Sequence, residues 1–149
     1  TGDHVFNSRN SYYCFDVNDL EDCAYMFNSY KVKDSLDTVY TGRHAELNYM
    51  CHSAVTLTNS NFCSVCWYSQ NLEYCEYVFN SHDCFGCISR NHAEYEILNQ
   101  KYEKEEYFKK VHAIKEQLKA EGSYGRWWWE SQYPELAPTP AYMALQYYS

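Results

Sequence analysis

Hydrophobic residues in the first hundred positions come in short runs that polar residues interrupt at a regular step. The runs are rich in aromatic and β-branched residues, as in Tyr12–Phe15, Ala54–Thr58 and Tyr77–Phe79. Each run is too short for a helix and has the composition of a strand. A polar residue, usually Asn, recurs about every ten or eleven positions: Asn7, Asn18, Asn28, Thr38, Asn48, Asn59, Asn71, Asn80 and Asn91.

Several of these segments also match one another in detail. Asp22–Ser29 resembles Tyr74–Ser81, and both Asn59–Cys66 and Asn80–Cys87 read N-S-x-x-C-x-x-C at a separation of 21 residues. A short, regular repeat is typical of a solenoid. Asn tolerates left-handed corners and can stack its amide in ladders. We therefore expect residues 1–101 to form a mainly β domain, a β-solenoid with about 21 residues per coil in two halves.

The periodicity becomes helical over residues 102–121. Tyr107, Val111, Ile114 and Leu118 have the spacing of one apolar stripe, and Gly122 suits the end of a helix. We expect this helix to cap the open end of the solenoid, with a partner-binding helix as the alternative. The most charged part of the repeat, residues 30–46, is expected to bulge or to form a degenerate coil.

Residues 122–149 form an aromatic tail that contains Trp127, Trp128, Trp129 and all three Pro residues. Pro blocks regular structure, so the tail should run extended. Either it packs across the solenoid, or some of its rings meet a partner or a second copy of the chain.

Charge and hydropathy exclude two classes of function. A formal net charge of -8 argues against binding of duplex nucleic acid, which depends on clustered Lys and Arg. No stretch approaches the roughly 18 apolar residues of a membrane span. The chain begins at Thr1 with neither a signal peptide nor an initiator Met. We expect Thr1 to be a start inside a longer protein or the result of processing.

The eight cysteines include two C-x-x-C pairs that combine as C-x2-C-x17-C-x2-C. This spacing predicts a structural zinc site with Cys63, Cys66, Cys84 and Cys87 as ligands, because coils of 21 residues would stack the pairs about 4.8 Å apart. An iron–sulfur cluster uses the same four thiolates and is the alternative. The spacing favours metal in a reducing, cytoplasmic compartment over a disulfide framework in a secreted protein. The other cysteines, expected to fill the coil interior, are Cys14, Cys23, Cys51 and Cys75.

Catalytic signatures are missing from the sequence. There is no G-x-S-x-G, no P-loop and no Gly-rich dinucleotide turn, and His112 has no His four residues away. His82, beside Cys84, is a surface turn residue, a group that supports the zinc ligands from outside, or an alternative ligand. The pattern favours a non-enzymatic, metal-stabilised repeat scaffold that binds a protein partner or a second copy. The alternatives are a thiol or iron–sulfur redox protein, and a binder of glycans or single-stranded nucleic acid through stacked aromatic rings.

Two segments, Asp83–Asn91 and Tyr95–Tyr107, carry a resemblance to a known family. They resemble the ending D-C-F-G-C-x-x-x-(R/K)-(N/H)-K-x-Y-x-I-x-N-K-x-Y-(S/T)-K-E-E-Y of uncharacterised cysteine-rich, zinc-ribbon-containing repeat proteins from uncultured small-genome bacteria. The resemblance covers roughly residues 7–120 and implies a metal-binding repeat protein, without implying an activity. This chain has fewer cysteines per coil than the family, and Glu103 stands where the family has a Ser or Thr helix cap.

Overall fold

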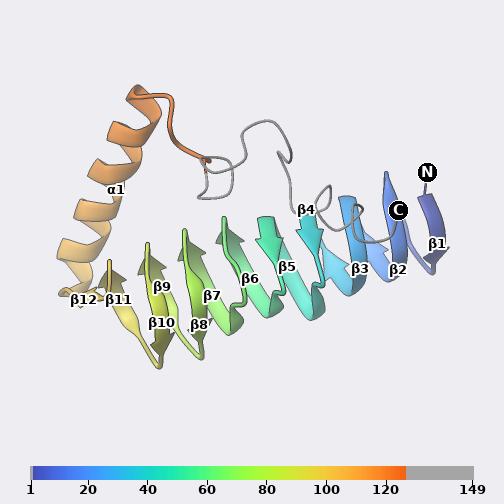
Figure 1. Ribbon diagram of the computed structural model, residues 1–149, viewed down its shortest axis with the longest axis horizontal. Coiled ribbons are helices and arrows are strands. Elements are labelled where there is room, and N and C mark those ends of the chain that lie inside the picture. Colours follow the sequence, from blue (N-terminus) through green and yellow to red (C-terminus); the bar gives the residue numbers. More distant parts are fainter. Residues whose placement is uncertain (1, 127–149) are drawn as a thin grey trace.

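The computed structural model describes residues 2–126, which wind into the predicted β-solenoid followed by one C-terminal helix (Figure 1). The fold is mainly β, with 58% of the described residues in strands and about 8 turns. The strands are β1 (Gly2–Phe6), β2 (Cys14–Glu21), β3 (Ala24–Lys33), β4 (Leu36–Val39), β5 (Gly42–His52), β6 (Val55–Asn61), β7 (Trp67–Glu73), β8 (Glu76–Phe79), β9 (His82–Phe85), β10 (Ile88–Asn91), β11 (Glu94–Ile97) and β12 (Gln100–Lys101).

Each coil is shorter than the sequence repeat indicated. Apart from the antiparallel pair β11–β12, the paired strands run parallel, and their partners are twelve residues apart outside the bulge described below, so that Val17 lies beside Ser29 and Leu57 beside Ser69. The expected coil of about 21 residues is therefore wrong. The 21-residue repeat contains a shorter period of three residues, because every third residue faces the interior. Two segments 21 residues apart share this inward phase but lie on different sides of the solenoid.

The period of three gives the coil four sides and four inward columns. Buried residues recur at every third position from Cys14 to Thr41 and again from Ala45 to Cys87. Between them, one residue of almost every triplet has a positive φ. Asn and Asp accept this conformation at little cost, which explains their frequency at the corners. Asn59 donates to Asn71, and Asn71 donates to Asp83, each twelve residues along, which confirms the predicted side-chain ladder.

One irregularity interrupts the triplets inside the charged segment 30–46. Arg43 and His44 both have positive φ, and the next inward residue after Thr41 is Ala45. The extra residue shifts the register where β5 pairs with β3 and β6. The predicted irregularity is thus a bulge of one residue in an otherwise continuous coil.

The helix α1 (Lys104–Ala120) confirms the predicted segment 102–121. It lies at the C-terminal end of the solenoid (Figure 1), where Tyr107 is buried with Phe85 and Ile97. The Glu103 side chain makes no capping hydrogen bond, and Gly122 follows the helix with φ +67. No helix within residues 2–126 is long and apolar enough to cross a membrane. The Trp127–Trp129 part of the predicted tail lies outside the described residues.

Candidate functional site

All eight cysteines are free thiols that point into the coil interior. Those outside the C-x-x-C pairs fill the interior as expected, being 0–2% exposed. Every thiol donates to the backbone carbonyl two residues before it, for example from Cys63 to Asn61 at 3.2 Å and from Cys84 to His82 at 3.4 Å. Inward serines make the same contact, as Ser60 does with Thr58. Cys and Ser thus serve one structural role, which is a small inward side chain with a hydrogen-bond donor.

The predicted zinc ligands form two pairs that Cys75 separates. Cys63 and Cys66 lie on consecutive sides of the solenoid. Cys84 and Cys87 also lie on consecutive sides, further along the chain. Cys63 contacts the thiols of Cys51, Cys66 and Cys75, while Cys75 in turn contacts Cys87. The stacking of Cys63 on Cys84 that a 21-residue coil required does not occur, because Cys75 is the residue twelve positions along.

The thiols as arranged do not fit a four-thiolate metal centre. Within residues 2–126, no group of three or more His, Cys, Asp or Glu side chains is placed to hold a metal ion. The cysteine thiols instead donate hydrogen bonds to backbone carbonyls. Zinc or an iron–sulfur cluster at Cys63, Cys66, Cys84 and Cys87 therefore stays a prediction from sequence.

Burial and hydrogen bonds between neighbouring thiols shift the pKa of several of the cysteines. Burial raises the pKa of Cys63 and of Cys75 well above the ordinary value for a thiol, which keeps both protonated. Cys84 and Cys87 share a hydrogen bond that raises the pKa of Cys84. Hydrogen bonds from Cys75 and Cys84 lower the pKa of Cys87, and the Asn99 amide also donates to this sulfur at 3.5 Å. Cys87 is nevertheless 0% exposed, so its thiol has no route to a substrate.

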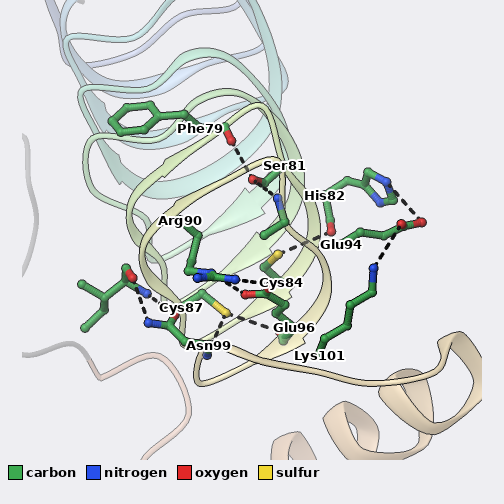
Figure 2. A network of polar contacts seen from close by, with 12 residues as sticks. Phe79, Ser81, His82, Cys84, Cys87, Arg90, Glu94, Glu96, Asn99 and Lys101 are labelled. Atoms are coloured by element: carbon green, nitrogen blue, oxygen red, sulfur yellow. Dashed lines mark hydrogen bonds and ion pairs between the residues drawn. The ribbon is translucent and has the colours of Figure 1, made fainter.

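Charged residues close the interior at the last coil (Figure 2). Arg90 donates from Nε and one terminal nitrogen to the two carboxylate oxygens of Glu96, both at 2.7 Å, and Glu96 is 4% exposed. Asn99 closes the same end by bonding both the N–H and the C=O of Ile88. The bidentate geometry and the burial indicate that the Arg90–Glu96 ion pair has a structural role, which is to close the core next to the turn that leads to α1.

His82 lies outside the coil, away from the thiols. Its Nδ1 is 2.8 Å from Asp83. Its Nε2 is 3.6 Å from Glu94 (Figure 2). Of the interpretations of this histidine, the geometry supports the surface residue. Its partners belong to the polar side of the solenoid, where Glu94 also approaches Lys101 at 3.9 Å.

The outer surface carries a cluster that sequence reasoning missed, the arginine patch, which consists of Tyr30, Arg43, Trp67 and Tyr68. Arg43 donates from Nε to the Tyr30 hydroxyl at 3.2 Å and from a terminal nitrogen to the Tyr68 hydroxyl at 3.3 Å. Trp67 donates to the Ser53 carbonyl at 3.0 Å and stays 39% exposed. The only sequence signal for the patch is the broken triplet at Arg43–His44, which becomes visible once the period of three is known.

Gly42 sets the position of Tyr30 within this patch. A Cβ built on Gly42 would lie 2.6 Å from a carbon of the Tyr30 ring, so the ring packs directly on the glycine backbone. Tyr30, Gly42, Val55 and Trp67 follow one another in register across neighbouring strands. A hollow of about 420 Å³ adjoins the patch, lined by Thr56, Thr58, Tyr68, Ser69, Gln70, Asn80, Ser81 and His82.

Comparison with known proteins adds no family. No protein-family model matches the chain, and no curated protein matches it. Among solved structures, it has a likeness to a "putative acetyltransferase" from Desulfovibrio desulfuricans G20, at 13% identity and a TM-score of 0.24. The match covers 66% of this chain and only 32% of that protein's length. A likeness this slight carries no argument about fold or function.

Proposed function

We propose that this protein is a non-enzymatic scaffold that binds another protein chain, a partner or a second copy, through the arginine patch. The observation that supports the proposal is the position of Arg43, held between two tyrosine hydroxyls on the outer surface of the solenoid. Tyr, Trp and Arg are the residues that contribute most often to hot spots of protein interfaces. Here all three residue types lie together and stay accessible.

The patch is ordered before any partner arrives. Tyr30 is fixed against Gly42, and the Trp67 ring packs edge-on against Phe79 with centroids 5.3 Å apart. Because these rings are already held, little side-chain entropy remains to be lost on binding. A guanidinium has five N–H donors, and Arg43 uses two of them, so others are left for a carboxylate or a backbone carbonyl of the partner.

A second candidate function, glycan binding, rests on the hollow beside Tyr68. Its wall combines an aromatic ring with the amides of Gln70 and Asn80, and an aromatic face with nearby amides suits a sugar ring. A glycan-array screen tests this candidate. Binding that Asn80→Ala abolishes would favour the sugar, and an empty array removes it.

The proposed function is tested with the double variant Trp67→Ala/Tyr68→Ala and the matched control Leu47→Ala. Leu47 is 50% exposed and lies on the polar side of the same solenoid. Sedimentation velocity measures self-association, and affinity capture with quantitative mass spectrometry measures partners. We expect the double variant to lose the dimer or the captured partner, and the control to keep it.

Unchanged far-UV circular dichroism and melting temperature show that the double variant is folded. A wild-type protein that sediments as a monomer and gives the same capture profile as the double variant would contradict the proposal.

A further inference from the structure

One side of the solenoid carries a long aromatic strip that the described chain covers over only part of its length. We call this side the tyrosine face. Its first column runs in register through successive coils, and its second column is the row of neighbouring residues. The first column is Tyr12, Ala24, Leu36, Tyr49, Asn61, Glu73, Phe85 and Ile97, and the second includes Tyr13, Tyr25, Asp37, Met50, Phe62 and Tyr74.

The C-terminal half of the tyrosine face is covered by the chain itself. Helix α1 packs on Phe85 and Ile97, and Tyr124 then packs on Phe62 and Tyr74 with centroids 5.7 and 6.2 Å away. Under this cover, Phe62 is only 3% exposed. The segment that follows α1 thus already binds this face by aromatic contacts.

At the N-terminal end of this face, the aromatic and aliphatic side chains are open, whereas Asp37 and Met50 nearer the border are buried. Tyr12, Tyr13, Tyr25 and Leu36 are 58%, 56%, 46% and 40% exposed. Tyr13 and Tyr25 stack with their rings 4° from parallel and centroids 5.2 Å apart, which makes a flat apolar platform. Exposed strips of this kind usually mark a binding surface.

The chain leaves the described region at the border between the two halves. The Gly125 amide donates to the Tyr74 hydroxyl at 2.6 Å, and a Cβ on Gly125 would lie 3.5 Å from the Phe62 ring. After Arg126 the sequence continues with Trp127, Trp128 and Trp129, then Tyr133 and Pro134. Four coil steps separate Phe62 from Tyr13, or about 19 Å at 4.8 Å per strand. Residues 127–149 could span up to roughly 75 Å when extended.

We propose that residues 127–149 bind along the open half of the tyrosine face and cover Tyr25 and Leu36. Tyr124 begins this contact, and the segment that follows it has the aromatic and proline content to continue it. Proline limits the conformations of the free segment, so less entropy is lost when it binds. The proposal is independent of the arginine patch, which lies on another side of the coil.

Photo-crosslinking in the full chain tests the proposal. A genetically encoded benzoylphenylalanine replaces Leu36 in one variant and Leu47, on the polar side, in the control. An equal mixture of unlabelled and 15N-labelled protein is irradiated, and the crosslinked peptides are identified by mass spectrometry. We expect crosslinks from position 36 to peptides within 127–149 of the same isotopic chain, and none from position 47.

The other outcomes overturn the proposal. Crosslinks of mixed isotope composition would assign the open face to a second copy of the chain. No crosslink to 127–149 from position 36, or equal crosslinking from both positions, would show that the segment does not occupy this face.

Discussion

At the scale of single residues, the high cysteine content follows from the geometry of a narrow coil. Each coil offers one inward position per side, and aliphatic side chains such as Leu57 and Leu72 share these positions with Cys and Ser, which place their donor on a carbonyl two residues back. Serine adds a second contact, since its oxygen also accepts the N–H of the residue twelve positions along. Ser60 accepts in this way from Leu72 at 3.0 Å and is itself 0% exposed.

Replacement of Ser60 tests this role. Ser60→Ala removes the hydroxyl that hydrogen-bonds the Leu72 N–H and the Thr58 carbonyl, and both groups are then left unpaired in a buried site. We expect the free energy of unfolding to fall by about 1–3 kcal/mol. Ser60→Cys keeps a donor of the kind used throughout the interior and should cost less. Urea unfolding followed by circular dichroism measures both. Equal costs for the two variants would contradict the role of the donor.

Asp37 makes the stability depend on pH. It is 8% exposed on the tyrosine face, and burial raises its pKa to about 6 from the ordinary 3.8. The folded state therefore holds this proton more tightly than the unfolded state. The resulting stabilisation is complete below about pH 4 and is lost as the pH rises through 6.

Asp37→Asn removes this dependence. The free energy of unfolding of the variant, relative to wild type, should rise between pH 4 and pH 7 by on the order of 1–3 kcal/mol. Urea titrations of both proteins at the two pH values give the difference, in which the other carboxyl groups cancel. A relative stability that is the same at both pH values would show that Asp37 has an ordinary pKa.

At the scale of elements, α1 depends on one buried ring. Tyr107 is 4% exposed, whereas the adjacent Phe108 is 47% exposed. Tyr107→Ala should lower the free energy of unfolding by about 3 kcal/mol, and Phe108→Ala by much less. Hydrogen exchange of the α1 amides, together with urea unfolding, measures the effect. Similar costs at the two positions would mean that α1 is not held through Tyr107.

The elements also show what the sequence could predict. The stripe from Tyr107 to Leu118 located α1, because helical spacing is strong over many turns. The aromatic runs and Asn corners predicted a β-solenoid, because this pattern also recurs many times along the chain. The coil length could not be read from the N-S-x-x-C repeat, since 21 residues is a whole number of triplets but not of coils. The step from Cys51 through Cys63 and Cys75 to Cys87 held the correct period of twelve.

The bulge and the arginine patch could not be predicted from the sequence, for a different reason. Which outward residues meet depends on the number of residues per coil, and one inserted residue at Arg43–His44 changes every later alignment. Only after the period of three was known could Arg43 be placed between Tyr30 and Tyr68. The same error in coil length paired Cys63 with Cys84 in the predicted zinc site.

At the scale of the whole molecule, four inward columns of buried side chains support a rod with distinct outer sides. Each interior thiol already has a backbone carbonyl as its hydrogen-bond partner, so the structure favours folding that does not depend on metal. We expect the circular dichroism and melting temperature of the protein to be unchanged after incubation with a chelator. One zinc per chain, lost together with the fold in Cys84→Ser, would instead confirm the sequence-based metal site.

The distance between Glu21 and Glu94 tests the twelve-residue coil most directly. Successive register partners connect these two residues along one column. Genetically encoded spin labels at both positions, measured by double electron–electron resonance, should lie about 29 Å apart, six strand spacings of roughly 4.8 Å. A coil of 21 residues would give about 17 Å from the same strand spacing. The shorter distance would contradict the four-sided coil, the columns of thiols and the surfaces built on it.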